Sequence, residues 1–285
     1  MRNSTLKNIE ITESIRKADS LAGDDLSSDQ IIKWYKEEEL AFDASEVSIY
    51  SKNLEIDPFY IYLRSLILKL SDCLRWPEKN KKIKVLCIGP GDGSEIKNIK
   101  GLLNNNLYFI ESSNYFIDLL EINFPGSNIL KSEPLGGINL KDASIDIVIC
   151  LSVLHHMPNV TKIISECYRV LDKDGTLIIR EPCSSMGNWK NPERKSTPNE
   201  RGIPRKWLLK TSKKIGFQKL KSTPIAFLPL SRLFKLLRLN KFMQSNLYFM
   251  LDRLISLLLV NNDKYFRKSF FQKLGPNVYF YELRK

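Results

Sequence analysis

The residues of this chain with the clearest chemical purpose lie between Lys84 and Glu95, where a short apolar run gives way to three alternating glycines. Gly89, Gly91 and Gly93 predict a strand, a tight turn and a helix start, because glycine tolerates positive φ and lets another molecule lie against the main chain. The first turn of the helix leaves amide N–H groups pointing outward, which suits hydroxyl, carboxylate or phosphate groups. A bound cofactor is therefore expected over this turn.

A second chemical feature is the acid that follows the next apolar run. Residues 107–110 read as a strand, and Glu111 comes directly after it, 18 residues beyond Gly93. A nucleotide-binding α/β unit places an acid at this position to accept hydrogen bonds from ribose hydroxyls. The turn and the acid fit one adenosine-containing ligand. Dinucleotide-dependent oxidoreductases and S-adenosylmethionine (SAM) enzymes both remain open at this point.

Two later stretches of the sequence distinguish between these two enzyme families. Residues 144–156, Ser-Ile-Asp-Ile-Val-Ile-Cys-Leu-Ser-Val-Leu-His-His, and residues 171–179, Leu-Asp-Lys-Asp-Gly-Thr-Leu-Ile-Ile, closely resemble the fourth- and fifth-strand motifs of class I SAM-dependent methyltransferases. With the glycine turn and Glu111 they make four motifs in the family's order. The resemblance covers about residues 80–182 and is to a domain of the methyltransferase type 11 kind.

The resemblance implies a set of cofactor contacts. The glycine turn would lie against the methionine part of SAM, Glu111 would hold the ribose, and the loop with Ser132 and Glu133 would contact the adenine. The full set implied in this way is Gly89, Gly91, Asp92, Gly93, Glu111, Ser112, Ser132, Glu133 and Leu151. Cys87 stands where the family usually has an acid that helps to hold the methionine amino group. Asp92, or an acid elsewhere, would have to replace it.

Two histidines follow the fourth predicted strand, beside the expected position of the methyl acceptor. Methyl transfer from a sulfonium is an in-line displacement, so the main task of the enzyme is to align acceptor, methyl group and sulfur. A hydroxyl acceptor must also lose a proton, and histidine titrates near neutral pH and can take it. We predict His155 as the first candidate for the catalytic base and His156 as the second, with Arg180 and Glu181 orienting the acceptor. No residue cluster indicates a metal site, and the five widely spaced cysteines read as buried thiols.

The elements that must position these residues alternate regularly along the chain. The apolar patterns predict strands at 83–88, 107–111, 128–131, 145–151 and 176–180, and helices at 58–74, 94–103, 114–124 and 160–171. Such alternation indicates an α/β fold with a doubly wound, Rossmann-like, mostly parallel sheet. A helix opening at Pro204, a strand at 217–221 and a last strand at 277–283 match the family's closing elements. In the family this last strand is antiparallel and lies between its neighbours.

The same patterns divide the chain into four parts. Residues 1–78 are expected to form an N-terminal tail and cap helices, 79–223 the SAM-binding core, 224–275 a helical insertion, and 276–285 the last strand of the core. Residues 184–203 are a polar stretch that leaves the fifth predicted strand at the sheet edge where open α/β proteins bind ligands. Long connections inside compact domains are usually functional or disordered, and we predict a substrate loop here.

The net charge of +12 comes from the last third of the chain. Residues 1–183 contain 22 Lys and Arg against 27 Asp and Glu, a balance of −5, whereas residues 184–285 contain 22 against 5, a balance of +17. Clustered positive charge attracts phosphates and acidic lipids. In the insertion, basic residues lie among apolar positions at helical spacing, as in an interfacial amphipathic element. We therefore expect an anionic substrate, either small or linked to a carrier, and a peripheral contact with an anionic membrane.

Together these features predict a SAM-dependent methyltransferase, with O-methylation of a saccharide or lipid intermediate favoured. One alternative is an RNA methyltransferase. However, residues 151–154, Leu-Ser-Val-Leu, lack the acid or amide, two prolines and aromatic residue that amine-methylating nucleic-acid enzymes of this superfamily commonly carry, so nucleic acid is not the expected partner. Another alternative is a SAM-fold binding module without catalysis, which only Cys87 supports. The absence of an apolar leader and of a run of about 20 uncharged apolar residues favours the cytoplasm.

Overall fold

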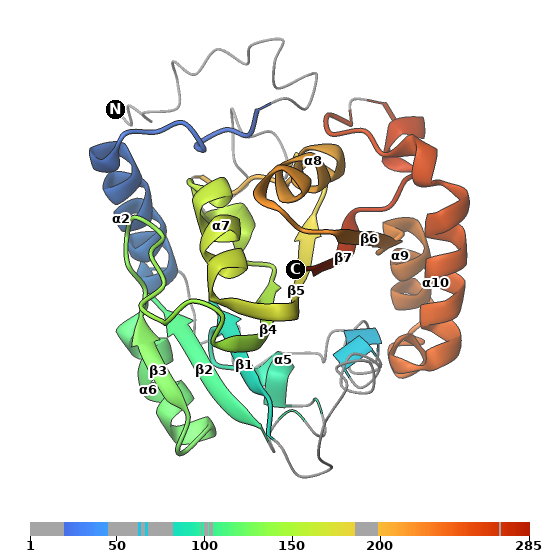
Figure 1. The fold of residues 1–285 in the computed structure, drawn as a ribbon. Helices are drawn as coiled ribbons and strands as arrows, with labels where there is room; N and C mark the ends of the chain where they lie inside the picture. The colour runs from blue at the N-terminus through green and yellow to red at the C-terminus, as the bar shows by residue number, and fades with distance from the viewer. Residues whose placement is uncertain are drawn as a thin grey trace.

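The computed structural model describes residues 20–44, 62–63, 66–67, 82–97, 99, 102, 105–185, 199–267 and 269–285. Figure 1 shows a twisted sheet in the centre, helices on both of its faces, and a helical part at the edge beyond the last strands. The helix predicted over 58–74 lies mostly outside the described residues, as does most of the substrate loop predicted over 184–203. Among the described helices, none combines the length and the apolar character needed to cross a bilayer.

Seven strands form one sheet in the order β3-β2-β1-β4-β5-β7-β6. Their bounds are β1 (Lys84–Ile88), β2 (Asn106–Glu111), β3 (Asn128–Lys131), β4 (Ile145–Leu151), β5 (Leu171–Pro182), β6 (Lys219–Ile225) and β7 (Val278–Arg284). The first five strands pair in parallel, whereas β7 runs antiparallel to both β5 and β6. The predicted fold class is confirmed. The strand order reverses between β1 and β4, the place where open α/β sheets bind ligands.

Helices cover both faces of this sheet. Their bounds are α2 (Ser28–Ala44), α5 (Ser94–Lys97), α6 (Asn114–Asn123), α7 (Val160–Val170), α8 (Arg205–Ile215), α9 (Leu228–Leu236) and α10 (Asn246–Leu258), with 3-10 turns η3 (Leu154–His156), η4 (Phe242–Gln244), η5 (Val260–Asn262) and η6 (Phe271–Lys273). On one face Val148 of β4 packs in a layer with Ile164 of α7, and on the other Ile149 packs with Leu120 of α6. Burial on both faces explains why the central strands read as continuous apolar runs.

Some predicted bounds differ from those of the structure. β5 extends beyond 176–180 at both ends, because it begins at Leu171, which pairs with Ile145 of β4, and continues along β7 until Pro182 pairs with Val278. β6 ends at Ile225, inside the insertion predicted over 224–275. It tolerates Pro224 because β6 is an edge strand, which forms ladder hydrogen bonds on one side alone. α5 covers Ser94–Lys97 of the helix predicted over 94–103, and of the later residues the structure describes 99 and 102.

Candidate functional site

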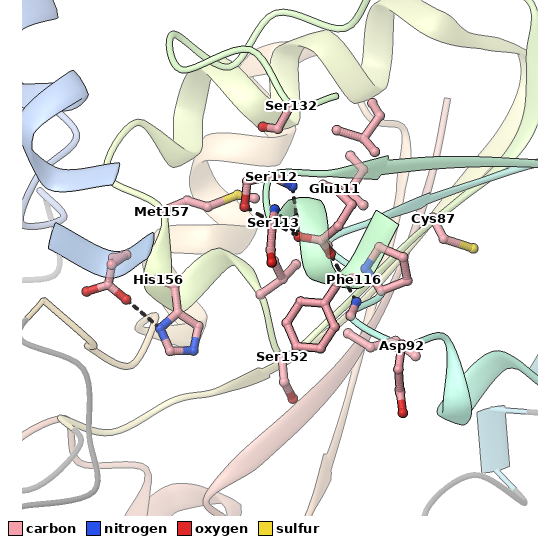
Figure 2. Close-up of a pocket in the computed structure, with 18 of the residues that line it drawn as sticks. Cys87, Asp92, Glu111, Ser112, Ser113, Phe116, Ser132, Ser152, His156 and Met157 are labelled. Atoms are coloured by element: carbon pink, nitrogen blue, oxygen red, sulfur yellow. Dashed lines mark hydrogen bonds and ion pairs between the residues drawn. The ribbon is translucent and has the colours of Figure 1, made fainter. Parts of the chain in front are cut away.

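A pocket of about 620 Å³ opens at the carboxyl ends of β1, β2 and β4 (Figure 2). Its walls come from the glycine turn, the end of β2, the loop after β3, the η3 turn and α2. Its lining residues include Tyr35, Glu38, Glu39, Cys87, Gly89, Gly91, Asp92, Glu95, Glu111, Ser112, Ser113, Phe116, Lys131, Ser132, Leu151, His155, His156, Arg180 and Glu200. This volume falls in the range of small-molecule sites.

Most of the cofactor contacts predicted from the sequence meet in this pocket, but Gly93 and Glu133 do not line it. A Cβ on Gly93 would collide with the ring of Phe124, so this glycine allows the turn to pack closely against the end of α6. The carboxylate of Glu133 instead lies over Gly137, where an added Cβ would collide with it. Gly93 therefore supports the turn by its packing and does not line the cavity. The carboxylate of Glu133 lies outside the cavity, beside Gly137.

Gly91 is the glycine of this turn at which the missing side chain leaves open space in the pocket. Its φ is +57°, and a Cβ there would meet nothing closer than the Phe116 ring at 4.0 Å. Gly89 has the same φ, but its missing Cβ makes room for the side chain of Val153. The backbone at Gly91 is thus left bare toward the cavity, as a cradle for a ligand requires.

Glu111 ends β2 with its side chain in the pocket wall, where it is 6% exposed. Its Oε2 accepts a hydrogen bond from the Gly91 N–H at 3.1 Å, and its Oε1 accepts from Ser112 N at 2.8 Å and Ser113 N at 3.2 Å (Figure 2). Burial raises the pKa of this carboxyl, and the backbone N–H groups act against that rise. Oε1 also accepts from Ser112 Oγ at 3.4 Å and has no lone pair to spare, whereas Oε2 keeps one for a further donor, such as a ribose hydroxyl.

Cys87 is buried in β1 and lines the same cavity. Burial raises the pKa of its thiol, so Cys87 supplies no negative charge there. Asp92 stands in the turn beside it, with Oδ1 accepting the Ser94 N–H at 3.0 Å. Another nearby acid, Glu95, lies 2.7 Å from Arg180. Asp92 is thus the acid that the glycine turn itself carries into the pocket.

His155 is held from behind by the buried carboxylate of Glu181. Glu181, 0% exposed, accepts hydrogen bonds from Val153 N at 2.8 Å and Leu154 N at 2.7 Å, and its Oε2 lies 2.6 Å from His155 Nδ1. On the other side of the ring, His155 Nε2 lies 3.5 Å from Glu200 Oε1. Because a carboxylate accepts at Nδ1, we assign a proton to that nitrogen. The second ring nitrogen lies toward Glu200, and both residues line the pocket.

The charges around His155 change its titration. Burial lowers its pKa, but the charge and hydrogen bond of Glu181, together with those of Glu200, outweigh burial and raise the pKa to about 9. Arg180, predicted with Glu181 to orient the acceptor, donates to Ser152 Oγ and Glu95. Glu181 orients the histidine, and Arg180 ties the end of β5 to α5.

A comparison with known protein families finds a match for the part of the chain that carries this site. Residues 86–179 match the family model of a methyltransferase domain. This span contains the glycine turn, Glu111 and both later motifs. The chain carries a class I SAM-dependent methyltransferase domain. No curated protein sequence matches the chain.

Solved structures share the fold of this methyltransferase. A SAM-dependent methyltransferase from Thermotoga maritima aligns with a TM-score of 0.52 at 16% identity, over 86% of this chain and 99% of that chain. A proposed sarcosine dimethylglycine methyltransferase from Galdieria sulphuraria gives 0.53 at 14% identity, over 79% and 84%. Haemonchus contortus phosphoethanolamine N-methyltransferase 2, in complex with S-adenosyl-L-methionine, gives 0.50 at 16% identity, over 76% and 52%. At these identities the likeness establishes the fold alone.

SAM is the cofactor of the methyltransferase family, and the pocket fits it. The bare backbone at Gly91, the fixed carboxylate of Glu111 and the neighbouring Ser112 form a cradle with donors and acceptors for a nucleoside and an amino acid. Ser132, after β3, lines the same pocket. These residues would hold the cofactor in the pocket that His155 and His156 also line.

The contacts that bring α2 into the site could not be predicted from the sequence. Glu38 Oε2 lies 3.0 Å from His156 Nδ1 (Figure 2), and its other oxygen accepts the Asn199 N–H at 3.1 Å. Trp34 Nε1 donates to the carbonyl of His156 at 2.7 Å. Glu38 and His156 are 118 residues apart, and a glutamate in a charged helix reads as a solvated side chain. No local pattern in the sequence signals this contact.

One group in the described residues resembles a metal site, although the sequence predicted none. Ligand atoms of His155, His156 and Glu200 lie within 4.8 Å of one another. Around a tetrahedral ion with ligand bonds of about 2.1 Å, neighbouring ligands are only about 3.3 Å apart. Both Nδ1 atoms also face carboxylates, and the raised pKa of His155 favours a proton on the ring. We therefore interpret the group as a hydrogen-bonded network.

Replacing Arg201 with leucine is expected to destabilise the methyltransferase by about 3 kcal/mol. Arg201 is buried, and its guanidinium donates to the carbonyls of Ala22 at 2.6 Å, His155 at 3.0 Å, Met157 at 2.7 Å and Pro158 at 3.1 Å. Burial lowers its pKa to about 10, so it stays charged at neutral pH. The substitution would leave the carbonyls of Ala22 and Met157 without this donor, while those of His155 and Pro158 keep a backbone N–H. Urea unfolding measures the loss.

Arg201→Lys keeps the charge but offers fewer donors, so it should lose less stability than Arg201→Leu. An unchanged urea midpoint in Arg201→Leu would contradict the structural role given to this arginine.

Proposed function

We propose that this methyltransferase transfers the methyl group of SAM to a hydroxyl group, with His155 as the general base. The acceptor is a small or carrier-linked molecule, such as a saccharide or lipid intermediate. The observation that carries the proposal is the 2.6 Å contact between His155 Nδ1 and Glu181 Oε2, which leaves Nε2 as the ring nitrogen for the acceptor, on the side where Glu200 lines the pocket. SAM supplies a methyl group activated on a sulfonium.

The residues around His155 fix the orientation of its ring and stabilise its protonated form. With its Nδ1 proton held by Glu181, the neutral ring offers the lone pair of Nε2 to the acceptor hydroxyl. The proton of the hydroxyl would pass to Nε2 as the oxygen bonds to the methyl carbon and the C–S bond breaks, with the neutral thioether as the leaving group. The imidazolium that results lies between Glu181 and Glu200, and both carboxylates stabilise it. Glu181 and Glu200 are therefore positioning residues, and His155 is the residue that touches the acceptor.

The charges of the residues that line the pocket limit the charge that an acceptor group can carry. The acids that line it are Glu38, Glu39, Asp92, Glu95, Glu111 and Glu200, and the basic residues are Lys131 and Arg180. An anionic group inside this cavity would meet a surplus of carboxylates. The acceptor is thus neutral or cationic where it reacts, and a phosphate of a carrier would lie outside the pocket, toward the basic last third of the chain.

The same surplus of carboxylates favours an amine as a second candidate acceptor. A cationic amine would be attracted into the pocket and, once deprotonated, attacks the methyl group without further help. A panel of hydroxyl and amine acceptors with radiolabelled SAM separates the two functions. Transfer to amines alone would replace the hydroxyl proposal, and transfer to neither would contradict both.

The pH dependence of transfer tests the role of His155. The base must be neutral, so kcat/KM for a hydroxyl acceptor should rise about tenfold per pH unit and level off near pH 9, where the pKa of His155 lies. Glu200 helps to raise that pKa, so Glu200→Gln should move the midpoint to lower pH. Initial rates between pH 6 and 10 give both curves.

An amine acceptor predicts a different result. The midpoint would then follow the pKa of the acceptor and stay in place in Glu200→Gln. A profile that is flat across this range would contradict a titrating base of either kind.

A further inference from the structure

Helix α10 turns an apolar stripe to solvent. The residues it buries are Tyr248, Phe249, Asp252 and Ser256. The residues it exposes are Leu247, Met250, Leu251, Leu254, Leu257 and Leu258. These exposed positions recur every three or four residues, which places them on one side of the helix. A surface helix in water normally buries such a stripe, so α10 is oriented the opposite way.

Specific contacts hold α10 in this orientation. Asp252 accepts the Ala226 N–H at 2.8 Å and the Phe227 N–H at 2.9 Å, where the chain enters α9. The Tyr248 ring lies 5.4 Å from the ring of Phe234 in α9, and Phe249 packs with the core layer beneath β6. Rotating the helix to bury its leucines would break these contacts. The exposed stripe is therefore part of the native fold.

Neighbouring segments extend the apolar surface. Helix α9 lies beside α10 at the edge of the molecule (Figure 1), and it exposes Leu233 and Leu236, with Leu237 exposed directly after its end. Phe270 and Phe271 are exposed past the end of α10, and Asn262 Nδ2 donates to the Phe271 carbonyl at 2.7 Å. The exposed residues of α9 and α10, with Phe270 and Phe271, are called the edge surface below. Apolar patches of this size on a soluble protein mark interaction sites.

The charges on the edge surface have one sign. Arg232, Lys235, Arg238 and Lys241 are exposed along α9 and the turn that follows it. Residues 226–275 contain two acids, and neither opposes these cations. Asp252 is buried, and Asp263 lies 3.2 Å from Arg205. The edge surface thus presents leucines together with basic side chains that the two acids of 226–275 do not compensate.

We propose that the edge surface docks on an anionic lipid bilayer. Leucines of α10 enter the boundary between headgroups and acyl chains while basic side chains of α9 meet lipid phosphates, as interfacial amphipathic helices do. A second copy of the chain fits less well. In a twofold dimer the same patch meets itself, and the basic residues would face one another without an acid to pair with. This inference goes beyond the proposed methyl transfer and does not depend on it.

Vesicle sedimentation of the full chain tests the proposal. Vesicles of phosphatidylcholine with phosphatidylglycerol should bind the protein at least about tenfold more tightly than phosphatidylcholine alone, and salt should weaken that binding. Leu254→Glu with Leu258→Glu should lower binding at least about tenfold. Ile122→Glu on α6 is the matched control, because Ile122 and Leu258 are both 74% exposed. It should bind as the parent does.

A second pair of variants tests the charges. Arg232→Glu with Lys235→Glu should remove the preference for anionic vesicles, and circular dichroism checks that each variant is folded. Equal binding of the leucine variants and the parent would overturn the proposal, as would equal binding to both lipid mixtures. A dimer in light scattering that the leucine variants dissociate, without vesicle binding, would assign the edge surface to a second copy. RNA binding with a steep salt slope, again without vesicle binding, would assign it to nucleic acid.

Discussion

Replacing His155 with alanine is expected to lower methyl transfer to a hydroxyl acceptor by about 10²–10⁴-fold and to leave SAM affinity nearly unchanged. The substitution removes the nitrogen that takes the acceptor proton, and it leaves the glycine turn and Glu111 in place. Single-turnover rates with radiolabelled SAM measure the chemical step, and calorimetry measures cofactor binding. The two readouts distinguish a lost base from a lost cofactor site.

Imidazole added to the buffer gives this prediction its sharpest control. It fills the volume that His155→Ala leaves and can act as the base, so it should restore part of the rate, more at high pH than at low pH. His156→Ala should have a smaller effect, because His156 Nδ1 is held by Glu38 on α2 rather than by the buried Glu181. Full turnover by His155→Ala would rule out this residue as the base and leave alignment as the main source of catalysis.

The features that could be read from the sequence are those that a local pattern determines. The apolar runs of the central strands and the glycine turn between Ile88 and Ser94 depend on neighbouring residues, and the structure has them where they were expected. Most predicted contacts line one pocket because parallel strands bring their carboxyl ends to the same edge. Position along a strand was therefore enough to place Glu111 and His155.

The features that could not be read depend on contacts between distant segments. Glu38 meets His156 and Arg201 meets Ala22 across more than 100 residues, and neither residue belongs to a motif. The direction of the α10 stripe was also hidden, because helical periodicity shows that a helix has an apolar side but not which side the protein buries. Asp252 decides it by accepting two backbone N–H groups, a contact that exists only in the folded chain.

Gly91→Leu is expected to abolish measurable SAM binding. The leucine would project into the space that the cradle leaves open, where the nearest atom to an added Cβ is the Phe116 ring at 4.0 Å. It would also hold a branched side chain at a φ of +57°, a strain of about 1–3 kcal/mol. The strain lowers stability, whereas the occupied space lowers affinity. Calorimetric titration with SAM and thermal unfolding separate the two effects.

Gly126→Leu supplies the matched control, because Gly126 also has a positive φ, +83°, and an added Cβ there meets nothing within 4 Å. It lies in the turn between α6 and β3, and it does not line the pocket. We expect Gly126→Leu to lower the melting temperature while SAM affinity stays at the parent value, since it carries the backbone strain without the blocked cradle. If Gly91→Leu bound SAM as tightly as Gly126→Leu does, the cofactor would have to lie elsewhere, and Gly91 would be an ordinary turn residue.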